Sequence, residues 1–185
     1  IRLAPEPTPS ETSPVAPASG TESRLSIIKR LSKLDTKSFH GGPGTPYIAL
    51  PVTLLQYLPT KPFGKNSEPR LDLLIEARLL GVPGTVRTAK DANITGVGMG
   101  PVVKSHRDLR LNFLKPIATG IVQLAQQHNQ DAPDAGDYAV IEILPKEPRC
   151  RITFVTDPSE KARLAPLCTE GSWGWAPDDL LAPWP

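Results

Sequence analysis

The sequence predicts an α+β fold in which a small, mostly antiparallel sheet of four or five strands packs against one long helix. Residues 138–144 and 149–156 are rich in β-forming side chains, and the four residues PKEP between them are typical of a hairpin connection. An apolar stripe from Pro116 to about His128 has the spacing of an amphipathic helix, with the proline suited to its first turn. Hydrophobic residues make up 39% of the chain and aromatic residues only 5%, so we expect a core of mainly Leu, Ile and Val.

The two ends of the chain differ in composition from its middle. Residues 1–21 consist largely of Pro, Ser, Thr, Ala and Glu, with little apolar surface to offset the entropy of ordering. We therefore expect an extended, flexible arm there. Residues 166–185 form a Pro- and Trp-rich tail. A single globular domain is expected to span residues 22–165.

Residues 22–35 have the pattern of a short basic amphipathic helix. Apolar residues recur at every third position, and Ser19 followed by Glu22 fits a capping box. The positions between them carry four cations, Arg24, Lys29, Arg30 and Lys33. Such a helix could lie on an anionic membrane surface or contact nucleic-acid phosphates. It could equally be an ordinary packed helix with a solvated basic face.

Glycine and proline divide the middle of the chain into short elements. Residues 47–58 form an apolar run that predicts a buried strand, broken or bulged at Pro51. Residues 70–80 alternate apolar and charged side chains, which favours a half-buried strand, although their Leu, Glu, Ala and Arg content also suits a helix. Residues 81–107 are Gly-rich and predict an irregular segment. A further strand is expected over residues 108–113, where apolar and polar side chains alternate.

Residues 96–101, GVGMGP, resemble a phosphate-binding loop only in their glycine content. Such a loop must lead into a helix whose backbone N–H groups face the anion, and no helix pattern follows here. A flexible or bulged connection explains these glycines better.

Other candidate chemistry is sparse. Three histidines fall in or beside predicted loops: His40, His106 and His128. A catalytic or metal-binding role would require two of them to converge, so exposed loop histidines are the simpler interpretation. The aspartates of residues 129–137 could approach a calcium ion, but Asp is also an ordinary turn residue. We expect no metal ion and no cofactor.

Charge and cysteine content place few limits on partners and compartment. A net charge of +2 does not by itself indicate a nucleic-acid-binding protein. No apolar stretch approaches the roughly 18–20 residues that a membrane span needs. Cys150 and Cys168 allow at most one disulfide bridge. The sequence begins at Ile1 rather than at methionine, which points to processing, so the localisation stays open between a soluble and a peripheral protein.

All three tryptophans lie in the tail: Trp173, Trp175 and Trp184. Tryptophan has a large apolar surface that is costly to leave in water. The three side chains therefore either fold back onto the domain or bind in a partner's pocket, where tryptophan is favoured.

These features favour a non-enzymatic structural or interaction protein, a self-associating subunit of a larger assembly such as a virion or a matrix-like membrane lining. Its expected partners are other copies of itself, other subunits or an anionic membrane surface, with nucleic acid ranked lower. Two alternatives remain. One is a small hydrolase that uses the loop histidines, and the other is a nucleic-acid-binding subunit that uses the basic helix.

Overall fold

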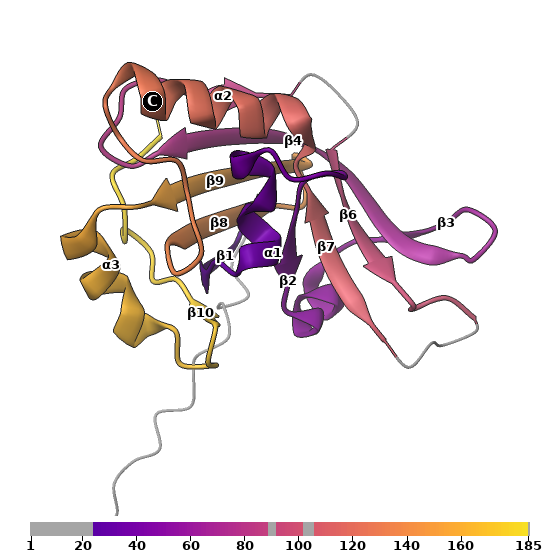
Figure 1. Cartoon of the computed structure of the whole chain (residues 1–185). Coiled ribbons are helices and arrows are strands. Elements are labelled where there is room, and N and C mark those ends of the chain that lie inside the picture. Colours follow the sequence, from indigo (N-terminus) through magenta and orange to yellow (C-terminus); the bar gives the residue numbers. More distant parts are fainter. Residues whose placement is uncertain (1–23, 89–91, 102–105, 185) are drawn as a thin grey trace, which may run out of the picture.

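The computed structural model describes residues 24–88, 92–101 and 106–184, which form a curled, ten-stranded mixed sheet (Figure 1). The strand order is β10-β1-β8-β9-β4-β6-β7-β2, and β3 and β5 also pair with β4. The strands are β1 (Leu25–Arg30), β2 (Tyr47–Leu50), β3 (Lys61–Phe63), β4 (Glu68–Leu79), β5 (Val86–Arg87), β6 (Ala92–Val97), β7 (Asp108–Asn112), β8 (Tyr138–Leu144), β9 (Arg149–Val155) and β10 (Trp173–Trp175). The helices are α1 (Lys33–Thr36), α2 (Leu114–Gln127) and α3 (Pro158–Leu164), with 3₁₀ turns η1 (Lys37–His40), η2 (Val52–Tyr57) and η3 (Ala165–Leu167).

The predicted fold class is wrong in its main feature. The sheet is not a small one of four or five strands with one long helix. It has ten strands and curls into a half-barrel, and the helices are short, with 14 residues in α2. The expected arm of residues 1–21 and the capping box at Ser19 lie outside the described residues. No helix in the described part of the chain is long and apolar enough to cross a membrane.

The predicted basic helix is also wrong, because most of it forms strand β1. Leu25 and Ile27 face the interior of the half-barrel, whereas Ile28 faces a second apolar cluster on the outer side. A strand that is buried on both faces loses the alternation that identifies most strands. The apolar residues of this segment recur at about every third position, and this spacing was mistaken for that of a helix. A capping box does occur, but Ser32 and Asp35 form it at the start of the four-residue helix α1.

Strand β4 links the two halves of the sheet. Its residues 74–79 run parallel to β9, and its residues 70–73 pair antiparallel with β6. The A half comprises β10, β1, β8, β9, β5 and the end of β4. The B half comprises the start of β4 with β3, β6, β7 and β2. The strand interpretation of residues 70–80 and the hairpin of β8 and β9 are confirmed.

The segments around glycine and proline were predicted less well. Residues 81–107 contain β5 and β6 and are not wholly irregular. Pro51 ends β2 and caps η2, so the predicted strand over residues 47–58 is replaced by a short strand and a 3₁₀ turn. The predicted helix after Pro116 is present as α2, which begins two residues earlier.

The main core fills the concave side of the sheet beneath α2 and η1. Three aromatic rings lie at its centre, with ring centroids 5.9 Å apart for Phe39 and Phe113 and 5.2 Å apart for Phe39 and Phe154. Ile117 and Ile121 of α2 are fully buried there. A second, smaller cluster lies on the outer side of the A half, where α3 and the C-terminal segment pack against β1, β8 and β9.

A buried ion pair links β1, the strand next to one end of the sheet, to β2 at the other end. Lys29 of β1 points into the half-barrel, and its Nζ lies 2.9 Å from an Asp35 carboxylate oxygen. The same carboxylate accepts hydrogen bonds from the backbone N–H groups of Ser32 and Ala49, at 2.8 and 2.9 Å. Lys29 in turn donates to the carbonyl oxygen of Ala49. The ion pair thus satisfies the backbone N–H and carbonyl groups of Ala49, on the free edge of the end strand β2. Burial lowers the pKa of Lys29, although Asp35 acts to raise it.

Candidate nucleic-acid interface

The outer sides of the two halves of the sheet differ in exposure. In the A half, α3 and the C-terminal segment cover the outer side and bury Ile28 and Leu164 completely. In the B half, Phe63 remains 55% exposed on the outer side. Strands β3, β6 and β7 form the right-hand wing in Figure 1. The outer side of this wing is the candidate site.

Strand register places polar side chains of the B half in two transverse rows. Because Leu71, Ile94 and Leu111 face the core, their neighbours in the sequence face outward. We call this surface the B face. Its first row is Arg70, Thr95 and Arg110, and its second row is Asp72, Asn93, Asn112 and Tyr47.

Each arginine of the first row is held by a ring and a carboxylate. The guanidinium carbon of Arg70 lies 4.0 Å from the ring centre of Phe63, and its Nε donates to Asp72 at 2.8 Å. Arg110 repeats the arrangement, 4.6 Å from the Tyr47 ring and 3.0 Å from Asp108. A guanidinium that is fixed in this way presents its remaining N–H groups in a defined direction.

Amide and hydroxyl groups lie between the two arginines. Asn112 donates to the side-chain oxygen of Asn93 at 2.7 Å, and the Thr95 hydroxyl donates to the same oxygen at 2.6 Å. These bonds orient three short polar side chains on β6 and β7. The Nε of Arg110 is buried and has no hydrogen-bond partner among the described residues.

Two loops meet at one end of the B face. The backbone N–H of Gly98 donates to the Glu68 carboxylate at 3.0 Å. A Cβ on Gly100 would lie 2.0 Å from the carbonyl oxygen of Asn66, so only glycine fits this close approach. Gly100 therefore serves loop packing, whereas Gly96 lies inside strand β6 and not in a connection. Lys65 and Arg107 are exposed cations near this end of the face, and Lys61 is exposed beside Arg70.

The four cations of the predicted basic helix do not share a surface. Arg24 pairs with Glu142 on the outer side of the A half. Lys29 lies inside the half-barrel, whereas Arg30 and Lys33 are exposed. Lys29 is separated from Arg24 and Arg30 because successive residues of a strand point to opposite sides, and Lys33 belongs to α1.

The tryptophans pack against this chain itself in the structure. Trp173 and Trp175 belong to β10, which pairs with β1, and Trp175 meets Tyr57 edge-on at 5.8 Å. Trp184 packs on the outer side of the A half. Whether any of them also contacts a partner stays a prediction.

The histidines are separate in the part of the chain that is described. His40 lies near Asp134 and the carbonyl oxygen of Pro133, at 3.5 and 3.1 Å, and His106 and His128 are exposed. No hydrogen bond or ion pair between described residues joins two of them. No three His, Cys, Asp or Glu side chains within the described ranges are placed to share a metal ion.

The two cysteines are not bridged, and they differ in burial. Burial raises the pKa of both thiols, most strongly for the fully buried Cys150. Because the thiolate is the reactive form, we expect iodoacetamide to modify Cys168 slowly and Cys150 only after unfolding. Mass spectrometry after timed alkylation, with and without denaturant, measures this order. Faster modification of Cys150 than of Cys168 in the native protein would contradict the burial.

Comparison with known proteins yields a distant structural likeness. No family model matches the sequence, and no curated protein matches it. Among solved structures, the N-terminal domain of Helicobacter pylori LlaJI.R1 is similar at 7% sequence identity with a TM-score of 0.48. The match covers 84% of this chain and 99% of that one. At this level the similarity concerns the course of the chain and says nothing about function.

The residues of the B face were missed in the sequence. They come from separate strands, and their proximity depends on pairing that no local pattern reveals. A partial signal was present in residues 92–95 and 110–112, where polar and apolar residues alternate as in a half-buried strand.

Proposed function

We propose that this chain is a non-enzymatic nucleic-acid-binding domain that contacts its ligand through the B face. The observation that carries the proposal is the pair of ring-stacked, carboxylate-held arginines, Arg70 and Arg110, with amide and hydroxyl groups between them. This differs from the expectation from sequence, in which a basic helix would have provided the contact.

The side-chain types of the B face suit nucleic acid. Arginine matches phosphate with a planar set of donors and also pairs with base edges. Asparagine and threonine supply the short polar contacts that fix a protein on a sugar-phosphate backbone or discriminate between bases. Phe63 is 55% exposed beside Arg70, and an exposed ring of this kind can stack on an unpaired base.

The charge of the region supports moderate rather than strong binding. Five cationic side chains lie on or beside the B face: Lys61, Lys65, Arg70, Arg107 and Arg110. Three carboxylates accompany them: Glu68, Asp72 and Asp108. The aspartates orient the arginines but reduce the attraction for phosphate. Because the salt dependence of the affinity scales with the number of phosphate contacts, we expect a shallow dependence here.

The other expected partners have less support. Membrane contact was proposed for a basic helix, and the structure has no such helix at residues 25–30. Self-association would involve residues outside the B face. The B face therefore remains the surface with the strongest argument for a ligand.

Substitution of the two arginines tests the proposal. We expect Arg70→Gln and Arg110→Gln each to weaken binding of fluorescent oligonucleotides about tenfold, or ~1.4 kcal/mol, measured by anisotropy on single- and double-stranded DNA and RNA. Glutamine keeps a polar side chain of similar length, and circular dichroism checks that each variant is folded.

The matched controls are Arg30→Gln and Lys33→Gln, which remove exposed cations outside the B face. We expect them to change the affinity less than about twofold, since such distant cations add little specific contact. Equal losses of affinity in the control and B-face variants would show that the attraction is non-specific. A loss of affinity in the controls alone would favour binding through the cations of residues 22–35. Undiminished binding by the Arg70→Gln/Arg110→Gln double variant would refute the proposal.

A further inference from the structure

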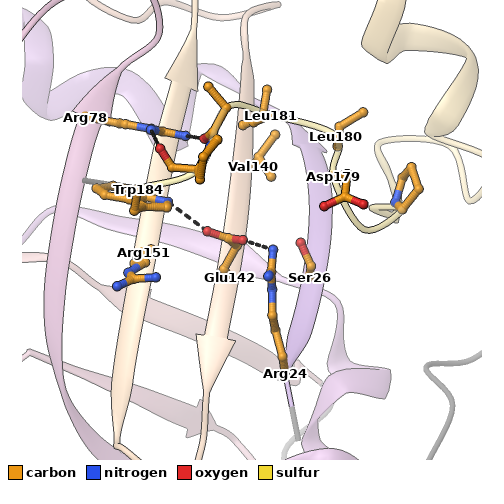
Figure 2. Close-up of a pocket in the computed structure, with 13 residues that line it drawn as sticks. Arg24, Ser26, Arg78, Val140, Glu142, Arg151, Asp179, Leu180, Leu181 and Trp184 are labelled. Atoms are coloured by element: carbon orange, nitrogen blue, oxygen red, sulfur yellow. Dashed lines mark hydrogen bonds and ion pairs between the residues drawn. The ribbon is translucent and has the colours of Figure 1, made fainter. Parts of the chain in front are cut away.

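The outer side of the A half forms a groove that the C-terminal segment occupies. Residues 177–184, here called the strap, cross β1, β8 and β9 (Figure 2) and leave a cavity of about 300 Å³ beneath them. Leu180 and Leu181 pack against the outer apolar cluster with Ile28 and Val140. Arg163 of α3 donates to the carbonyl oxygen of Leu180 at 3.1 Å.

Trp184 occupies a shaped seat in this groove. Its indole N–H donates to the Glu142 carboxylate at 2.8 Å. Arg78 lies over the ring at 4.3 Å and Arg151 at 5.5 Å, so that the indole is between two guanidinium groups, as Figure 2 shows. The Glu142 side chain is only 12% exposed, which makes its hydrogen bond to the indole a specific one.

Arg78 recognises the main chain of the strap. It donates to the carbonyl oxygen of Ala182 at 2.7 Å and to the hydroxyl of Thr153 at 2.9 Å. No described carboxylate lies within ion-pair distance of Arg78. The groove thus has three features that suit an extended peptide: an apolar patch, a donor to backbone carbonyls and an indole seat.

The strap is attached in a way that allows it to leave. Regular pairing to the sheet stops at β10, with one further bond from the backbone N–H of Ala176 to Ser26. The turn that follows contains Asp179 with a φ of 60°, in the left-handed region that a non-glycine residue adopts at a cost. Opening this turn relieves that strain and leaves the ten-stranded sheet unbroken.

We propose that the groove also accepts the strap of a second copy of this chain, so that two copies exchange straps reciprocally and form a dimer at high concentration. Exchange reproduces the contacts of residues 180–184 between subunits and replaces the strained turn at Asp179 by an open linker. Short connections under strain favour this kind of swapping. The dimer gives the predicted self-association a physical basis that is separate from the B face.

The length of the turn provides the first test. Deleting Asp178 and Asp179 from the full chain shortens the reach of the strap by about 7 Å. The strap then no longer reaches its own groove, and we expect a stable dimer in size-exclusion chromatography with light scattering. Asp179→Gly should have the opposite effect, because glycine adopts a positive φ without strain. Adding Trp184→Ala to the deletion should return the protein to a monomer.

A peptide provides a second test that does not depend on the folding of the deletion variant. A synthetic peptide of residues 177–184 should bind the Trp184→Ala chain, whose own strap is weakened, at least about tenfold more tightly than it binds the intact chain. The same peptide with alanine in place of tryptophan is the matched control. The proposal is wrong if the deletion variant is monomeric at every concentration, if its dimer survives Trp184→Ala, or if the peptide does not bind.

Discussion

Replacement of Asp35 by alanine is expected to lower the free energy of unfolding by about 3–5 kcal/mol. The substitution leaves the Lys29 ammonium, only 8% exposed, with the Ala49 carbonyl as its remaining partner. It also removes the acceptor for the N–H groups of Ser32 and Ala49. Urea denaturation followed by circular dichroism measures the change.

The two members of the ion pair should differ in cost. Lys29→Met leaves the Asp35 carboxylate with hydrogen bonds from Ser32 and Ala49, so we expect a smaller loss than for Asp35→Ala. Lys33→Met, at an exposed position in α1, is the control and should change stability by less than about 0.5 kcal/mol. If Asp35→Ala costs no more than this control, the ion pair does not hold β1 and β2 together.

Gly174→Ala is expected to destabilise the protein by about 3 kcal/mol. Gly174 pairs with Ile28 in the middle of β10, and a Cβ there would lie 1.9 Å from the carbonyl oxygen of Leu167. Since the obstructing atom belongs to the backbone of η3, no side-chain rotation can relieve the clash. Either η3 moves outward or β10 separates from β1.

The expected drop in melting temperature is roughly 6–12 °C for a chain of this size. Ser172→Ala, at an exposed position just before β10, is the control and should melt within about 2 °C of the intact protein. A melting temperature for Gly174→Ala equal to that of the control would show that β10 is not packed beneath η3 as described.

Local sequence patterns predicted the elements that are joined by a short turn or that bury only one side. The β8–β9 hairpin has β-rich strands around a short turn, and α2 has one apolar side, so both patterns are clear. Strand β1 was mistaken for a helix because Ile27 and Ile28 are buried on opposite sides. Strand β6 was missed because its alternating pattern is short and is interrupted by Gly96, which has no side chain to mark the inward side. In the structure, Pro69 and Met99 fill the space where a Cβ of Gly96 would lie.

The candidate site depended on tertiary structure that the sequence does not display. Arg70, Thr95 and Arg110 are adjacent only because β4, β6 and β7 pair in one register. The two aromatic rings that hold the arginines come from β2 and β3. Similarly, nothing near Trp184 in the sequence indicates that Glu142 and Arg78 form its seat.

The salt dependence of oligonucleotide binding tests the central claim most directly. The account predicts that the logarithm of the association constant falls linearly with the logarithm of salt concentration, as released counterions require. It also predicts that Arg70→Gln and Arg110→Gln each reduce the slope by about one unit, whereas Arg30→Gln leaves it unchanged. Binding that is insensitive to salt, or a slope that is the same in the intact protein and the Arg70→Gln/Arg110→Gln double variant, would contradict the assignment of the B face as the nucleic-acid-binding surface.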